Sequence, residues 1–238
     1  MADTLAVRIF ELLCVGLWLA GLRWIRRQKN PVYSGAYFGS STLFLFDWMF
    51  NSNWFFRVEF DAKFIDLWRI QGVSEPLAMA FNYAFYFGAP VVLLAHHREA
   101  IDRRFGRNGW LVVFLGACAI LPLFECPMVS WAHLWTYYQK PGFELWGVPW
   151  SNIWYSGVLT TTCYGAVRLA VRWARVPVSV GAGGSRAAPE PAEASDEDRW
   201  RGMAMGAAGI WAAFYVSMLL QLAWYALTQP WVATPRPF

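Results

Sequence analysis

The chain has 238 residues, of which 57% are hydrophobic, 18% are aromatic and only 15% are charged. Soluble domains carry roughly 25% charged residues, so this composition excludes an ordinary soluble domain and is typical of an integral membrane protein. The net charge of +4 does not indicate nucleic-acid binding, because the basic residues flank apolar runs and form no patch with a known binding motif.

Apolar runs follow one another along the chain, and a helix of about 20 such residues can cross a bilayer. We expect an all-α integral membrane protein whose helices form one bundle. Six transmembrane helices are expected, at about residues 5–25, 33–56, 76–95, 110–131, 148–171 and 202–228.

Basic residues in the connections predict the orientation, since cytoplasmic connections are enriched in Lys and Arg. The connections after the first, third and fifth runs hold 14 of the 20 Lys and Arg residues, whereas the opposite connections hold five. We therefore expect both termini to lie outside, in a bacterial cytoplasmic membrane.

The connection 57–75 mixes apolar and charged residues. Phe60, Phe64 and Trp68 recur at four-residue spacing, which predicts one apolar stripe on a short helix. We expect this helix to lie on the outer membrane surface. An ordinary amphipathic connector is the alternative.

The connection 173–201 is rich in Gly, Ala, Pro and acidic residues. Such a composition cannot build a core and predicts a flexible cytoplasmic linker. The linker would separate a five-helix membrane core, residues 1–172, from residues 202–238, a sixth helix with a short outer tail.

Polar residues inside the apolar runs share one depth, the outer half of the membrane. This agreement across the expected helices predicts a single polar cavity that opens toward the outside. The residues are Glu11, Asp47, Asn51, Asn53, Asn82, Glu125, Asn152 and Gln221.

Asp47 and Glu125 are acids at bilayer depth, where each costs roughly 2.5–3.5 kcal/mol on insertion scales. Asn51 lies four residues after Asp47 and shares its helix face. Glu125 lies between two prolines, which remove backbone donors and predict a kinked, polar stretch of helix. Two carboxyls in different surroundings are suited to general acid and base catalysis.

A structural explanation stays open for the same residues, because polar side chains also hold neighbouring membrane helices together. Asn82 and Gln221 are candidates for that role. For Glu11 we expect an ion pair with Arg8, one turn earlier.

Metal and redox cofactors are not expected. His96 and His97 are adjacent and lie on the inner side, whereas His133 lies near the outer mouth. The four cysteines form no CxxC pair, and no metalloprotease, phosphate-loop or dinucleotide-binding motif is present.

The order of several motifs resembles the avermectin spirocyclase (AveC-like) family of membrane proteins. The motifs are FLFDWMFNSNWFF, a loop ending in SEPL, HHREAIDRRFGR, a run ending in FE, and TYYQKPG. The similarity covers about residues 36–175. The stretch GVPWSNIWYSG also resembles carotenoid 1,2-hydratases of the CruF type.

The spirocyclase resemblance implies acid-assisted ring closure on a polyketide, in which a hydroxyl attacks a ketone or hemiketal and water leaves. It places the catalytic acids at Asp47, Glu75 and Glu125. Residues expected to contact the substrate are Asn51, Asn53, Trp68, Asn82, His133, Tyr137, Asn152 and Gln221.

We therefore expect a cofactor-free membrane enzyme of secondary metabolism that acts on a lipophilic small molecule. The alternatives are a carotenoid or terpenoid hydratase or cyclase, a non-catalytic lipid-binding protein, and a small proton-coupled transporter. The two acids would also serve a transporter, but we find no internal repeat of the kind that many transporters carry.

Overall fold

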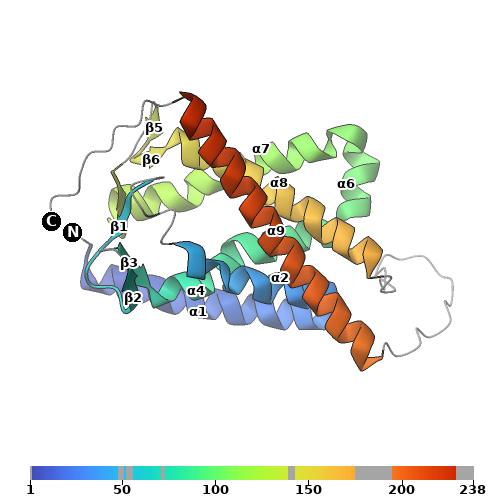
Figure 1. Cartoon of the computed structure of the whole chain (residues 1–238). Helices are drawn as coiled ribbons and strands as arrows, with labels where there is room; N and C mark the ends of the chain where they lie inside the picture. Colours follow the sequence, from blue (N-terminus) through green and yellow to red (C-terminus); the bar gives the residue numbers. More distant parts are fainter. Residues whose placement is uncertain are drawn as a thin grey trace.

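The computed structural model describes residues 2–47, 51, 56–70, 73–138, 143–174 and 195–228. These residues are mainly helical, with three two-stranded antiparallel sheets (Figure 1). The helical elements are α1 (Thr4–Arg27), α2 (Pro31–Ser41), η1 (Leu43–Phe46), α4 (Leu77–Tyr83), η2 (Ala84–Gly88), α5 (Ala89–His96), α6 (Arg98–Phe105), η3 (Gly106–Asn108), α7 (Gly109–Cys126), η4 (Pro127–Trp131), α8 (Trp150–Trp173) and α9 (Asp196–Thr228). The strands are β1 (Val58–Phe60), β2 (Asp66–Ile70), β3 (Val73–Pro76), β4 (Trp135–Tyr137), β5 (Glu144–Leu145) and β6 (Val148–Pro149).

Four helical stretches among the described residues are long and apolar enough to cross a membrane. They are Thr4–Arg27, Leu77–His96, Arg98–Trp131 and Asp196–Leu227. The expected helical membrane protein is therefore confirmed at this coarse level.

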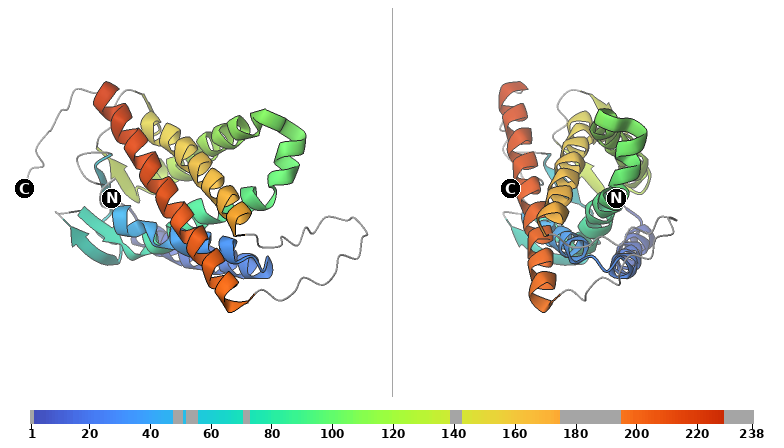
Figure 2. Two further views of the ribbon diagram at one scale, coloured as in Figure 1. Left: turned by 45° about the vertical axis from the view of Figure 1, so that its right-hand side comes forward. Right: turned by 90° about the vertical axis from the view of Figure 1, so that its right-hand side faces the viewer.

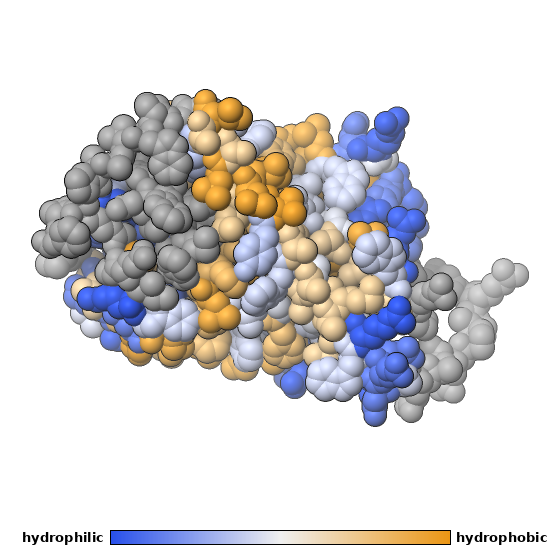
Figure 3. Space-filling model, in the orientation of Figure 1, coloured by the Kyte–Doolittle hydropathy of each residue, from blue (hydrophilic) through white to orange (hydrophobic). Residues whose placement is uncertain are grey.

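The charged residues lie mostly at the ends of the molecule. In Figure 3, hydrophilic side chains gather at the end where α6 lies, and a more apolar band follows toward the sheets. The strands lie at the opposite end, together with the start of α1 and the end of α9 (Figure 1). This distribution is the one that a membrane-crossing bundle requires.

Helix α9 packs along α2 and α8, as both views in Figure 2 show. The approach to α2 is close because both helices carry glycine at the crossing. A Cβ on Gly35 would lie 1.9 Å from the carbonyl oxygen of Met203, and one on Gly206 would lie 2.1 Å from that of Val32. Small residues of this kind allow membrane helices to pack backbone against backbone.

The second expected span, 33–56, is not one continuous helix. Helix α2 ends at Ser41, and the short 3₁₀ helix η1 follows before Asp47. The hydroxyls of Ser40 and Thr42 donate to the carbonyls of Ala36 and Gly39, at 2.8 and 2.7 Å. Such side-chain bonds compete with the helical ladder and bend helices. Residues 48–50 and 52–55 lie outside the described part of the chain.

The expectation of a surface helix at 57–75 is wrong, because this segment forms strands. β1 pairs with β4, and β2 pairs with β3 in a hairpin. Pro76 favours extended backbone in the residue before it, and β4 comes from a connection distant in sequence. Phe10 holds the sheets on α1 through edge contacts with Phe64 and Trp135, each with ring centroids 5.9 Å apart.

In the described part of the chain, two π-helical segments interrupt helices that contribute to the molecular centre. η2 lies between α4 and α5, and η4 follows α7 and begins at Pro127. Glu125 itself lies in α7, which continues through Pro122, and the π segment begins two residues after Glu125. π turns insert an extra residue into a helix and are frequent at functional sites.

The connection expected to be a linker, 173–201, falls largely outside the described part of the chain, which omits 175–194. Its last residues are helical, because α9 begins at Asp196. Ser195 accepts a hydrogen bond from the Asp198 backbone N–H at 3.1 Å and so caps this helix. The expected outer tail after residue 228 is likewise not described.

Candidate functional site

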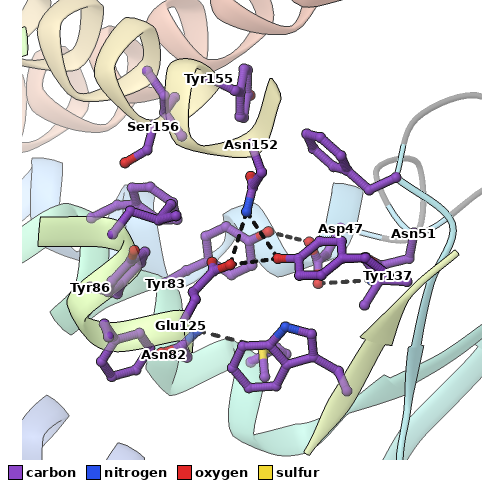
Figure 4. Close-up of a pocket in the computed structure, with 18 of the residues that line it drawn as sticks. Asp47, Asn51, Asn82, Tyr83, Tyr86, Glu125, Tyr137, Asn152, Tyr155 and Ser156 are labelled. Atoms are coloured by element: carbon purple, nitrogen blue, oxygen red, sulfur yellow. Dashed lines mark hydrogen bonds between the residues drawn. The ribbon is translucent and has the colours of Figure 1, made fainter. Parts of the chain in front are cut away.

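A polar cavity of about 90 Å³ lies between α4, η2, α7 and α8, beside Asp47 and strands β1 and β4 (Figure 4). Ligand pockets for drug-sized molecules measure roughly 300–1,000 Å³, so this cavity holds a few waters or one small chemical group. The lining residues are Asp47, Asn51, Phe56, Val58, Phe60, Met79, Asn82, Tyr83, Tyr86, Phe87, Leu121, Phe124, Glu125, Trp135, Tyr137, Asn152, Tyr155, Ser156, Leu159 and Phe214.

Glu125 carries two hydrogen bonds on one oxygen. Tyr137 donates its hydroxyl to Oε2 at 2.6 Å, and Asn152 donates Nδ2 to the same oxygen at 2.9 Å. Asn152 also donates to the Tyr137 hydroxyl at 2.9 Å, so the three side chains form a closed ring of bonds. Both side-chain donors that reach this carboxyl from the described residues thus contact Oε2. A proton on this carboxyl is therefore best placed on Oε1.

Asp47 is organised differently, because each of its oxygens accepts a hydrogen bond. Tyr83 donates its hydroxyl to Oδ1, and Asn51 donates Nδ2 to Oδ2 at 3.1 Å. Two donors shared between two oxygens favour an ionised carboxylate. Asp47 and Asn51 are 5% and 3% exposed, so this pair is buried in the protein.

Glu75 is fully buried on β3 beside Asp47, although it does not line the cavity. Burial and the nearby Asp47 carboxyl raise the pKa of Glu75 well above its usual range. Two adjacent carboxyls cannot easily both ionise. Glu75 is therefore suited to hold the proton of the pair, which leaves Asp47 as the charged member.

The tyrosine beside Glu125 is a stable donor. Burial, together with the charge of Glu125, raises the pKa of Tyr137 well above its usual range. Tyr137 lies on β4 and is 5% exposed. It therefore keeps its proton and its bond to Glu125 near neutral pH.

The structure brings the two acids of the bilayer-depth pattern to one cavity, as predicted. Figure 4 shows Asp47 and Asn51 at one end, Glu125 and Asn152 at the other, and the Tyr137 ring extending between them with its hydroxyl at Glu125. Asn82 also lines the cavity, and its Nδ2 lies 3.5 Å from the Met79 sulfur.

Other predicted contacts lie elsewhere. Trp68 stacks on Phe44, with ring centroids 5.1 Å apart, and does not line the cavity. His133 is exposed beyond η4. Gln221 is buried on α9 and donates to the Ser151 carbonyl at 3.5 Å, so it joins helices α8 and α9. Asn53 lies outside the described residues.

The expected pairing of Glu11 with Arg8 is confirmed. Glu11 also accepts the backbone N–H of Ile65 at 2.8 Å, which ties α1 to the connection before β2. Glu11 is therefore a structural residue at the sheet end of the molecule.

Sequence reasoning found Tyr137 but missed the other hydroxyl residues of the cavity. Tyr83 and Tyr86 come from α4 and η2, and Tyr155 and Ser156 come from α8. A depth argument restricted to acids and amides overlooks tyrosine. Tyr86 lies four residues after Asn82, and Tyr155 and Ser156 lie three and four residues after Asn152, so helical spacing could have found these three.

Among the residues that the structure describes, no group of three or more His, Cys, Asp or Glu side chains could hold a metal ion. The chemistry open to the cavity's own residues is proton transfer and hydrogen bonding. A comparison of the chain with protein-family models, curated proteins and solved structures finds no match in any of the three.

Proposed function

We propose that the protein is a membrane enzyme that uses its own carboxyls for acid–base catalysis on a lipophilic small molecule. One observation carries this proposal: two buried carboxyls from distant segments face one small cavity with different hydrogen-bond partners. Carboxyls that serve only to join helices have no need of a shared cavity. A pair with unlike surroundings is the usual equipment for paired acid and base work.

The roles follow from the donors. Asp47, with donors on both oxygens and Glu75 beside it, acts as the general base. Glu125, with both donors on Oε2, keeps Oε1 for a proton and acts as the general acid. General acid and base groups of this kind each contribute about 10²–10⁴-fold.

The reaction class that best fits these roles is cyclisation with loss of water, as in spiroketal formation. Asp47 takes the proton of a substrate hydroxyl, whose oxygen forms a C–O bond to a hemiketal carbon. The C–OH bond at that carbon breaks, and Glu125 donates the proton with which the departing hydroxyl leaves as water. The cavity admits only the reacting part of such a substrate, because its volume is about 90 Å³.

We also propose that six segments cross a bacterial cytoplasmic membrane, with both termini outside. Beyond the four long apolar stretches, the added segments are α2 with η1 and α8, which has 24 residues. The basic residues of α6 and the last turns of α1 and α8 then lie in the cytoplasm. Cysteines placed in 96–108 should resist an impermeant reagent in intact cells, and their labelling would reverse this orientation.

The enzyme proposal is tested by mass spectrometry of lipids from cells with and without the protein. We expect a lipophilic species that differs from its precursor by the mass of one water, and that is absent when Asp47→Asn and Glu125→Gln are combined. A water gained instead of lost would indicate a hydratase. An unchanged lipid profile with lipid still bound to the purified protein would support a non-catalytic binder and contradict the proposal.

A further inference from the structure

An apolar groove of about 290 Å³ adjoins the polar cavity and runs along α7. It is bounded by η2 and α5 on one side and by α8 on the other. None of the residues that line it is charged. The lining residues are Tyr86, Phe87, Pro90, Leu94, Ile101, Val112, Val113, Gly116, Ala117, Ile120, Leu121, Ser156 and Thr160.

The groove and the polar cavity share part of their walls. Tyr86, Phe87, Leu121 and Ser156 line both. Tyr86 packs against Phe124 of the cavity with ring centroids 4.8 Å apart, so these two rings lie at the boundary of the two spaces. The shared lining residues place the groove directly beside the cavity.

The groove follows α7 from Leu121 back to Val112, which is about 14 Å at the rise of an α-helix. Its rim is open toward the apolar surroundings, since Ile120 is 60% exposed and Val112 is 40% exposed. Gly116 forms part of its floor, and a Cβ placed there would meet no atom within 4 Å. The hollow at Gly116 is thus open space.

We propose that this groove binds the hydrocarbon chain of the substrate, an amphiphile that enters sideways from the bilayer with its small polar group in the cavity. This inference rests on the proposed function, because it assigns the substrate class of the same site. The small polar cavity admits the reacting group, and the uncharged groove admits the chain, whose far end lies toward α6.

The test uses a photoactivatable probe, a long-chain alcohol with a diazirine near its methyl end, and the full-length protein in lipid nanodiscs. Peptide mass spectrometry should place the crosslinks at the α6 end of the groove, on Ile101 of α6 and on Val112 and Val113 of α7. Gly116→Phe should fill the open floor and reduce this labelling by about tenfold or more.

Gly16→Phe is the matched control. A Cβ placed on Gly16 would also meet no atom within 4 Å, but this glycine lies on α1 and lines neither space. Ala117→Phe gives a second block if Gly116→Phe does not fold. Labelling that is equal in both blocked variants and in the control, or that is spread over α1, would overturn the groove assignment.

Failure of this inference is distinguishable from failure of the proposed function. In the Glu125→Gln variant, the lipid product that differs from its precursor by one water should disappear, and the groove residues should still be labelled by the probe. Absent groove labelling with an intact lipid change would reject only the chain site, whereas groove labelling without any lipid change would reject only the enzyme.

Discussion

The two carboxyls of the cavity are buried to similar extents, yet their surroundings differ. Glu125 is held by two donors on the same oxygen, from β4 and α8. Asp47 is held by one donor on each oxygen and has a second carboxyl, Glu75, beside it. Hydrogen bonding that is one-sided leaves a place for a proton, whereas hydrogen bonding on both oxygens favours a charge.

This difference teaches that burial alone does not set the role of an intramembrane acid. The backbone elements that bring the donors decide which carboxyl gives a proton and which takes one. Substitutions that change one carboxyl's surroundings and leave the other's intact can therefore separate the two roles.

The largest effect is expected from removing either titrating group. Asp47→Asn and Glu125→Gln should each reduce turnover by about 10²–10⁴-fold, because the amide keeps the size of the side chain but cannot transfer the proton. The measurement is the rate of the lipid change, with insertion and folding checked separately. Glu11→Gln, at a structural acid outside the cavity, should turn over normally.

A smaller loss is expected at the asparagines. Asn152→Ala removes one donor from Glu125 and one from Tyr137, and each of these hydrogen bonds between neutral groups is worth about 0.5–1.5 kcal/mol. Turnover should fall about 10–100-fold. Asn51→Ala removes the corresponding donor from Asp47, and its turnover is measured for comparison. Unchanged turnover in both variants would mean that the amides do not orient the acids.

The tyrosines should give a weaker effect still. Tyr137→Phe removes one donor from Glu125 but leaves the bond from Asn152, so turnover should fall by about tenfold or less. Combining it with Asn152→Ala should give less than the product of the two losses, since the residues share one ring of hydrogen bonds. A double variant whose loss of turnover equals the product of the two single losses would show that Tyr137 and Asn152 act independently.

Glu75→Gln should change stability more than turnover. The folded protein binds the Glu75 proton more tightly than the unfolded chain, so stability is lost as pH rises from the unfolded pKa, about 4.3, toward the raised folded pKa. Gln does not titrate, so the Glu75→Gln variant does not lose stability in this way as pH rises. Above neutral pH its Tm should exceed that of the parent by about 2–4 °C for each kcal/mol of unfolding free energy that the parent has lost. Near the unfolded pKa the two Tm values should be equal.

Thermal unfolding in detergent across that pH range measures this difference. The reverse order, with the variant gaining stability only in acid, would show that Glu75 is ionised beside Asp47. Glu59→Gln is the control, because it makes the same chemical change at an exposed position of β1. It should not reproduce the pH-dependent Tm difference.

The sequence predicted the site better than the scaffold around it. Intramembrane acids and amides are costly, so their common depth at Asp47, Glu125 and Asn152 reports a real cavity. The helical spans 5–25, 76–95 and 110–131 also follow from apolar length alone.

The remainder depends on contacts between distant segments. β1 takes its partner from β4, so spacing within 57–75 could not reveal a strand. The position of Glu75 behind Asp47 likewise depends on that strand packing and not on any local pattern. The sequence places Tyr137 near the outer mouth, but the bond from Tyr137 to Glu125 requires β4 to fold back over η4.

The most direct test of the division between acid and base is infrared difference spectroscopy of the purified protein near neutral pH. Glu125→Gln should remove the carbonyl band of one protonated carboxyl from the parent spectrum. Asp47→Asn, made in a Glu75→Gln background, should remove a carboxylate band and leave the protonated carboxyl of Glu125 in place. Loss of a protonated band with Asp47→Asn, or none with Glu125→Gln, would contradict the assignment of Glu125 as the acid and Asp47 as the base.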